Sequence, residues 1–117
     1  MEPAPLKSRI PYDVFAQLDI RVGTIVEVSD VEGSSKLLRL RVDFGDGVRT
    51  ILSGMKKERP DAQALVGVQT LFVVNLEPRR MAGEVSDGML FDLGHADGVT
   101  PRLAIPEGPI PNGARAG

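Results

Sequence analysis

The sequence lacks several residues on which catalysis and metal binding commonly depend. It has no cysteine, which excludes disulfide bonds and thiolate metal ligands. Its one histidine, His95, lies in the turn-like stretch HADG, and a metal site through Asp92, His95 and Asp97 would need ligands that the neighbouring sequence does not offer. Neither glycine-loop motif for phosphates, GxxxxGK or GxGxxG, occurs. These absences predict that the protein is not an enzyme and holds no metal or cofactor.

Aromatic residues are also scarce, at 4% of the chain, with no tryptophan, one tyrosine and four phenylalanines. A surface that binds nucleic acid by stacking needs exposed rings on adjacent strands. Phe44 and Phe72 instead stand in patterns typical of a core. Recognition of a nucleic acid would therefore have to use arginine and asparagine side chains and backbone groups.

Long apolar runs are missing as well. No run approaches the ~20 residues that a membrane-spanning helix needs, so no membrane association is expected. The first residues, MEPAPLKSRIP, lack the apolar stretch of a secretory signal. We therefore expect a soluble, cytoplasmic protein.

The residues that are present are typical of one globular domain. The chain has 117 residues, of which 42% are hydrophobic and 26% charged. This composition predicts a single domain over 1–117, with 1–11 as a flexible N-terminal segment. Because the net charge is −2, any binding of RNA must come from local clusters of positive charge. Basic residues do form three such clusters: Lys36 with Arg39 and Arg41, Lys56 and Lys57 with Arg59, and Arg79 with Arg80.

Alternation of apolar and polar residues predicts a chain rich in β-strands. One strand is predicted to place on a single face the residues Ile20, Val22, Thr24, Val26 and Val28. Gly23, in the middle of this strand, suggests a bulge or bend. Further strands are predicted over 38–44, 48–53, 68–76, 89–94 and 102–106, with a tight hairpin at Gly45-Asp46-Gly47. Short helical turns are predicted at 12–18 and 61–65.

The number of strands and the lengths of their connections favour one architecture. A β-sandwich usually needs about seven strands. About five strands, a tight hairpin, one long connection and almost no helix are typical of a small barrel. We therefore predict an all-β, five-stranded OB-fold barrel with short helical turns and N- and C-terminal extensions.

Motifs along nearly the whole chain carry a resemblance to a known family. They are DIRVGTIVEV (19–28), SSKL (34–37), VDFGDG (42–47), ILSG (51–54), LVG (65–67), VVNLEPRRMAG (73–83), SDGML (86–90) and IPEGPIPNG (105–113). In this order and spacing they resemble the tRNA-binding domain family. That family includes stand-alone tRNA-binding proteins, the C-terminal domain of many methionyl-tRNA synthetases and the CsaA export-related chaperones. The sequence departs from the family at 31–37, where VEGSSKL replaces the common HPNADKL.

The resemblance implies an OB-fold homodimer that binds tRNA by its shape and backbone. It places the tRNA-facing positions at Lys36, Asn75, Arg79, Arg80, Ser86 and Met89. Guanidinium groups pair with phosphate in bidentate fashion, an amide bonds a base or 2′-OH, and methionine offers an apolar contact. Each residue type also has a structural alternative: solvation of a loop for the arginines, a backbone tie for Asn75, turn formation for Ser86 and core packing for Met89.

Two functions therefore remain open at the level of the sequence. The first is a non-catalytic tRNA-binding protein that uses the rim of its OB-fold. The alternative is a CsaA-like, export-related chaperone that binds unfolded preproteins. The expected partners are tRNA and a second copy of the chain, with an aminoacyl-tRNA synthetase or unfolded preproteins as further candidates.

Overall fold

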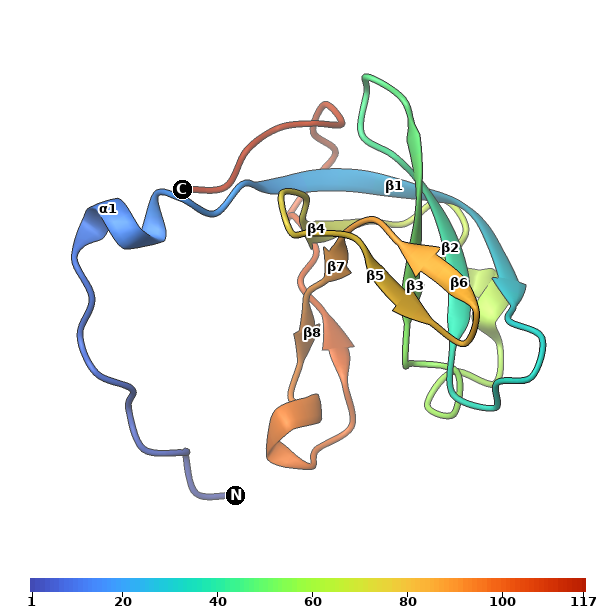
Figure 1. The fold of residues 1–117 in the computed structure, drawn as a ribbon, viewed down its shortest axis with the longest axis horizontal. Helices are drawn as coiled ribbons and strands as arrows, with labels where there is room; N and C mark the ends of the chain where they lie inside the picture. The colour runs from blue at the N-terminus through green and yellow to red at the C-terminus, as the bar shows by residue number, and fades with distance from the viewer.

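The computed structural model describes all 117 residues and contains one curled antiparallel sheet (Figure 1). Its strands run in the order β3-β2-β1-β4-β7. Their bounds are β1 (Ile20–Asp30), β2 (Leu38–Asp43), β3 (Val48–Ser53), β4 (Gln69–Val73) and β7 (Met89–Leu90). The sheet curls until its two edge strands, β3 and β7, lie against each other, and the Asp87 amide beside β7 donates to the Thr50 carbonyl of β3 at 2.9 Å. The predicted all-β, OB-like fold is confirmed.

Strand β1 bends at a bulge, and the position of this bulge corrects the predicted faces. β1 pairs with β4 through its first residues and with β2 through its later ones, and its register to β2 shifts between Ile25 and Glu27. The extra residue is Val26, which is 43% exposed, whereas Ile25 is fully buried. The prediction that Val26 shares a face with Val28 was wrong, because the extra residue places Ile25 and Val28, three positions apart, in the core and leaves Val26 outside it.

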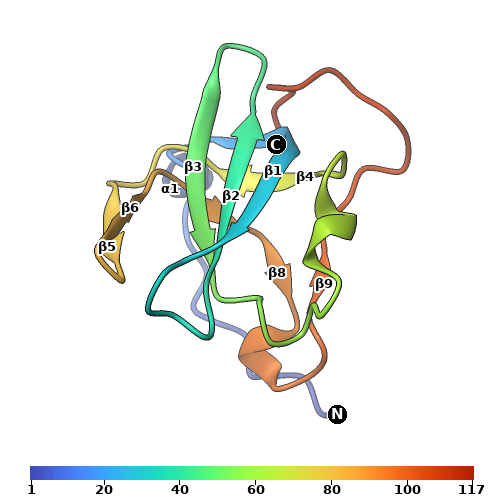
Figure 2. The ribbon, with the colours of Figure 1, turned by 90° about the vertical axis from the view of Figure 1, so that its right-hand side faces the viewer.

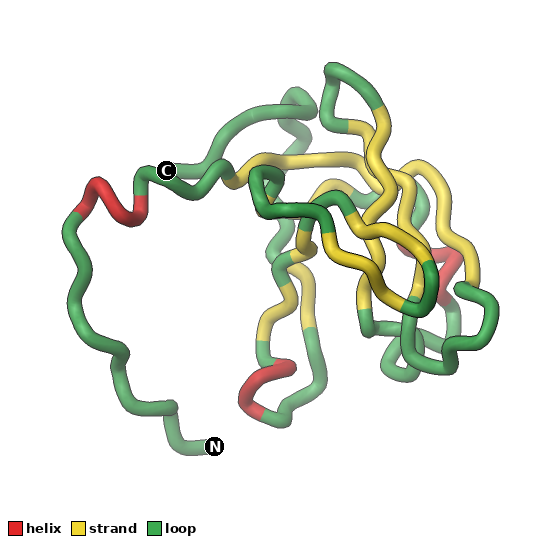
Figure 3. The backbone as a smooth tube through the Cα atoms, viewed as in Figure 1, coloured by secondary structure: helices red, strands yellow, loops and turns green.

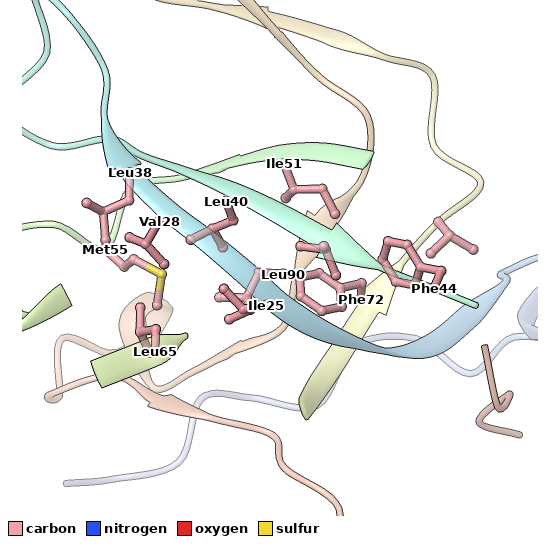
Figure 4. Close-up of a cluster of buried hydrophobic side chains, with 12 residues drawn as sticks. Ile25, Val28, Leu38, Leu40, Phe44, Ile51, Met55, Leu65, Phe72 and Leu90 are labelled. Atoms are coloured by element: carbon pink, nitrogen blue, oxygen red, sulfur yellow. The ribbon is translucent and has the colours of Figure 1, made fainter. Parts of the chain in front are cut away.

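The core lies inside the curled sheet (Figure 4). It comprises Ile25, Val28, Leu38, Leu40, Val42, Phe44, Ile51, Met55, Leu65, Phe72, Val74 and Leu90. The rings of Phe44 and Phe72 pack edge to face with their centroids 5.2 Å apart, so the prediction that both are core residues is confirmed. Leu65 comes from the short 3-10 helix η1 (Ala62–Leu65), which lies at the predicted helical turn.

Several short elements differ from the predicted strands. The expected strand over 89–94 is divided at Phe91 between β7 and β8 (Asp92–Leu93), which belong to different sheets. β8 pairs with β9 (Arg102–Leu103), shorter than the strand expected there, and η2 (His95–Asp97) lies between them. The segment between β4 and β7 contains an unpredicted hairpin of β5 (Arg79–Met81) and β6 (Glu84–Ser86).

The two ends of the chain behave differently (Figures 1 and 3). Residues 1–11 are exposed and form no helix or strand. They lie away from the barrel and are followed by α1 (Tyr12–Phe15), in which no residue is buried. The C-terminal segment runs along the first half of β1, with hydrogen bonds from Val22 N to Ala114 O at 2.9 Å and from Ala116 N to Ile20 O at 2.8 Å. No helix of the structure is long and apolar enough to span a membrane.

Gly23 permits the close approach of β1 to the core, which gives a test of the packing. A Cβ atom at this position would lie 2.5 Å from Val42 Cγ1 and 2.7 Å from the Phe44 ring. We expect Gly23→Ala to lower the free energy of unfolding by about 1–3 kcal/mol through overpacking. Urea unfolding followed by circular dichroism measures this change. The control is Gly54→Ala, where an added Cβ meets nothing within 4 Å; equal stability of the two variants would contradict the packing argument.

Candidate functional site

The hairpin of β5 and β6 carries three of the six residues that the resemblance singled out, Arg79, Arg80 and Ser86. Its register pairs Arg79 with Ser86, Arg80 with Val85 and Met81 with Glu84. The two turn residues between the strands, Ala82 and Gly83, have φ angles of 51° and 81°. Positive φ angles at both central residues are characteristic of the type I′ turn, whose twist matches that of the two strands it connects. Ala82 is the one non-glycine residue of the chain with positive φ, so the usual Asn-Gly signal was absent from the sequence.

The two adjacent arginines point to opposite faces of this hairpin. Residues paired across strands share a face. Arg79 therefore shares the barrel-facing side with Ser86, which is 3% exposed, and Arg80 shares the outer side with Val85, which is 47% exposed. Both arginines are exposed, and neither side chain takes part in an ion pair or hydrogen bond within the chain. Their guanidinium groups remain free to bind an anion from two sides.

Side chains of the barrel hold this hairpin at its tip and at its base. At the tip, Arg39 of β2 donates to Glu84 through Nε at 2.7 Å and also through Nη2. This hydrogen bond lowers the pKa of Glu84 and raises the pKa of Arg39. At the base, Arg49 of β3 donates through Nη1 to the Val74 carbonyl at 2.8 Å, and its Nε lies 4.0 Å from Asp87 Oδ2. The hairpin stands on the side of β3 opposite η1 (Figure 2).

Ser86 lies inside this arrangement rather than on its surface. Its Oγ accepts a hydrogen bond from the Leu52 amide at 2.9 Å and donates to the Gly88 carbonyl at 3.1 Å. The hydroxyl therefore completes the backbone hydrogen bonding between β3 and the hairpin. This burial and bonding correspond to the structural alternative for Ser86.

The Asn75 side chain also forms its hydrogen bonds within the protein. Its Oδ1 accepts from the Asp19 amide at 2.8 Å, and its Nδ2 donates to the Gln17 carbonyl at 2.7 Å. These bonds tie the end of β4 to the segment between α1 and β1, as the structural alternative for Asn75 describes. Nearby, the hydrogen bond from Arg21 lowers the pKa of Asp19 and raises the pKa of Arg21.

Met89 and Lys36 are both accessible to solvent but lie near opposite ends of the hairpin. Met89 is 44% exposed and pairs with Val73, close to the base of the hairpin. Lys36 is exposed in the loop between β1 and β2, where the Ser34 hydroxyl accepts from the Lys36 and Leu37 amides at 3.3 and 3.1 Å. Arg39, three residues beyond Lys36, reaches the hairpin tip through Glu84. The hairpin therefore spans the distance between Met89 and the loop of Lys36.

The loop of Lys36 and the segment between β4 and β7 flank the outer face of β2 and β3. In OB-folds this face and these two connections are the surface that binds oligonucleotides and oligosaccharides. The resemblance did not single out two arginines that lie on this face, Arg39 and Arg41. Arg49 lies on the other face of β3, where it pairs with Val42 and its guanidinium is 5.6 Å from the centroid of the Phe44 ring. The alternation in β2 did indicate that Arg39 and Arg41 face outward, and Arg41 donates to the Thr50 hydroxyl at 2.7 Å.

Comparison with families of known proteins assigns most of the chain to one group. Residues 20–115 match the model of a family described as a putative tRNA-binding domain. The chain is 45% identical, over 99% of its length, to a methionine–tRNA ligase of Streptococcus pyogenes, of which it covers 18%. The chain therefore corresponds to a small part of this longer enzyme.

Solved structures agree with this assignment. A MetRS-related protein of Pyrococcus horikoshii superposes with a TM-score of 0.86 and 32% identity, over 94% of this chain and 99% of the other. A CsaA chaperone protein of Picrophilus torridus superposes with a TM-score of 0.80 and 28% identity, over 93% of this chain and 100% of the other. Most of this chain thus shares its fold with both kinds of protein.

The buried hydroxyl of Ser86 gives a test that separates structure from ligand binding. We expect Ser86→Ala to lower the free energy of unfolding by about 1–3 kcal/mol, because the Leu52 amide would lose its acceptor. Chemical denaturation measures the loss, with Ser35→Ala, an exposed serine, as the control within about 0.5 kcal/mol of the parent. A Ser86→Ala variant of parental stability but weakened RNA binding would instead make Ser86 a ligand contact.

Proposed function

Because the chain belongs to the family of putative tRNA-binding domains, we propose that it is a non-catalytic module that binds tRNA by its shape and backbone. The contact surface is the outer rim of the barrel, formed by the hairpin and the loop of Lys36. One observation carries the proposal: Arg79 and Arg80 are exposed on a positioned hairpin and have no carboxylate partner.

The chemistry of these side chains suits a phosphate backbone. Guanidinium groups form charge-assisted, bidentate hydrogen bonds with phosphate oxygens. Arg79 and Arg80 lie on opposite faces of a narrow ribbon, so they fit phosphates on two sides of it better than one shared phosphate. Lys36 extends the positive surface, and Met89 offers a flexible apolar contact to a ribose or base. Contacts of this kind recognise shape and charge with little reading of sequence.

Asn75 and Ser86 act in this proposal as supports for the site. Asn75 fixes the segment that enters the hairpin, and Ser86 fixes the strand that leaves it. Both side chains have their hydrogen bonds satisfied by the protein, so binding RNA through them would require breaking bonds that already exist. The proposed contact set is therefore Lys36, Arg79, Arg80 and Met89.

A second candidate function is the binding of unfolded polypeptide. The similarity to a CsaA chaperone protein supports it, together with a cavity of about 730 Å³ lined by residues that include Tyr12, Phe15, Leu18 and Ile20. Polar residues such as Gln17, Asn75 and Arg115 also line this cavity, so it offers a peptide both apolar contacts and hydrogen bonds. The two functions use different surfaces, because the cavity borders α1 and the arginines lie on the hairpin.

The proposal includes a homodimer built around α1. Tyr12, Phe15 and Leu18 are 76%, 40% and 46% exposed, and α1 buries no residue against its own chain. A second copy that packs its own α1 here would cover these side chains across a two-fold axis, in place of the peptide considered above. The similarity to part of a methionine–tRNA ligase further supports a role in delivering tRNA to a synthetase in the cytoplasm.

Removal of both hairpin arginines tests the tRNA function. We expect Arg79→Ala with Arg80→Ala to weaken binding about tenfold or more, and to a similar degree for tRNAs of different sequence. The slope of log affinity against log salt concentration should become less negative. We expect a change of about 0.7–0.9 for each phosphate that is no longer neutralised. Filter binding at several salt concentrations measures both effects.

The control removes two positive charges elsewhere, with Lys7→Ala and Arg102→Ala, and is expected to change the affinity far less. An equal loss of affinity in both double variants would show that only the net charge matters. Binding of an unfolded preprotein that is insensitive to salt and to the arginine variants, with no measurable tRNA affinity, would favour the chaperone function.

Replacement of apolar residues beside α1 tests the dimer. We expect the parent protein to sediment as a dimer at micromolar concentration and Phe15→Asp with Leu18→Asp to sediment as a monomer. The double variant should keep the barrel, because these side chains are exposed within one chain. Val66→Asp, at a site that is 44% exposed beside η1, is the control and should remain a dimer. A parent protein that is monomeric at this concentration would refute the proposed dimer.

A further inference from the structure

The hairpin of β5 and β6 cannot hold its position by its own packing. Each strand has three residues, and a lone two-stranded hairpin is at best marginally stable in water. Of its residues only Ser86 is buried, and Arg79, Arg80 and Val85 are exposed. Little apolar area therefore fixes the hairpin on the barrel, and its polar contacts decide where its arginines lie.

These polar contacts are unevenly distributed along the hairpin. Ser86 and the Arg49 contacts hold the base, where the chain enters and leaves. At the other end, beside the turn, the hairpin is held to the barrel by Glu84 and its bond to Arg39. Without this bond the tip could swing about the base, and both arginines would move with it.

Arg39 is itself held rigidly, which makes it a suitable anchor. Its Nη1 donates to the Ser29 hydroxyl at 2.7 Å and to the Asp30 carbonyl at 3.0 Å, both on β1. The other edge of the guanidinium meets both carboxylate oxygens of Glu84. A planar fork fixed on one side by two acceptors can hold a carboxylate in one orientation, which a lysine ammonium cannot do.

The same ion pair keeps the hairpin's own arginines free. Glu84 lies diagonally across from Arg79 on one face, because Glu84 pairs with Met81 and Arg79 precedes Met81 by two residues. Diagonal neighbours in a hairpin are about 7–8 Å apart at Cα, within reach of long side chains. If Arg39 did not bind Glu84, this carboxylate could pair with Arg79 and compete with phosphate.

We propose that Glu84 and Arg39 are positioning residues, which fix the hairpin so that Arg79 and Arg80 together meet the tRNA backbone. This inference rests on the tRNA-binding function proposed above. Glu84 does not touch the RNA in this arrangement, and it aids the binding of a polyanion although it is itself an acid.

The replacement Glu84→Gln tests the proposal through the sign of its effect. Removal of a negative charge beside the site would strengthen RNA binding if charge alone mattered. Positioning predicts the opposite, and we expect total tRNA to bind about three- to tenfold more weakly in filter binding. The matched control is Glu77→Gln, which removes an equal charge from an exposed residue of the same segment and should leave affinity equal or stronger. Tighter or unchanged binding by Glu84→Gln would overturn the proposal.

Coupling to the arginines separates positioning from a general loss of stability. In a chain that already carries Arg79→Ala and Arg80→Ala, we expect Glu84→Gln to change tRNA affinity less than twofold, because no arginine remains on the hairpin to be positioned. Arg39→Gln should weaken binding in the parent at least as much as Glu84→Gln. An unchanged effect of Glu84→Gln in the chain without the arginines would overturn the positioning role.

Amide hydrogen exchange provides a measurement that does not depend on RNA. We expect the amides of Arg80 to Val85 to exchange faster in Glu84→Gln, with the core strands β1 and β2 unchanged. If Arg79→Ala with Arg80→Ala has no effect on tRNA, the tRNA function fails, while the exchange data still report whether Glu84 anchors the hairpin. If the arginine variant weakens binding but Glu84→Gln alters neither exchange nor affinity, only the positioning role fails.

Discussion

The fold depends on the pairing of one strand, β1, with two different neighbours. Its first residues pair with β4 and its later residues with β2, and the change of partner is accommodated by the bulge at Val26. A straight strand with unbroken register would extend a flat sheet, whereas a bulge adds bend and twist. This bend lets the sheet curl until β3 approaches β7 and encloses a core that includes Ile25 and Phe72. It also brings β3 beneath the hairpin that carries the arginines.

On the proposed binding face, ion pairs between arginines and carboxylates determine which positive charges are free. The protein as a whole carries no excess of positive charge. The chain as a whole is slightly acidic, with a net charge of −2. Arg39 on this face lies against Glu84, and Arg49 at the base of the hairpin lies against Asp87. The positive charges of the hairpin itself are consequently left for a ligand. Local electrostatics of this kind reconcile an acidic protein with a polyanionic partner.

The sequence predicted the fold class well and the details of the site only in part. Alternation identified β2 with its buried residues Leu38, Leu40 and Val42, because this strand contains no bulge. It failed in β1, where one extra residue lets Ile25 and Val28, three positions apart, both face the core. The hairpin escaped prediction because strands of three residues are too short to show a period. Asn75 and Ser86 could bond either protein or RNA, and their partners Gln17 and Leu52 lie 58 and 34 residues away in sequence.

The C-terminal segment has a consequence for how the barrel behaves in a crowded solution. Residues Ala114 and Ala116 occupy the backbone groups along the first half of β1 that face away from β4. The Gln69 and Thr24 side chains, which both donate to Asn112 Oδ1, fasten this segment to the sheet. An uncovered strand edge is a template on which another chain can add a strand and begin to aggregate. Residues 113–116 therefore cover this edge of β1 and protect it from edge-to-edge aggregation.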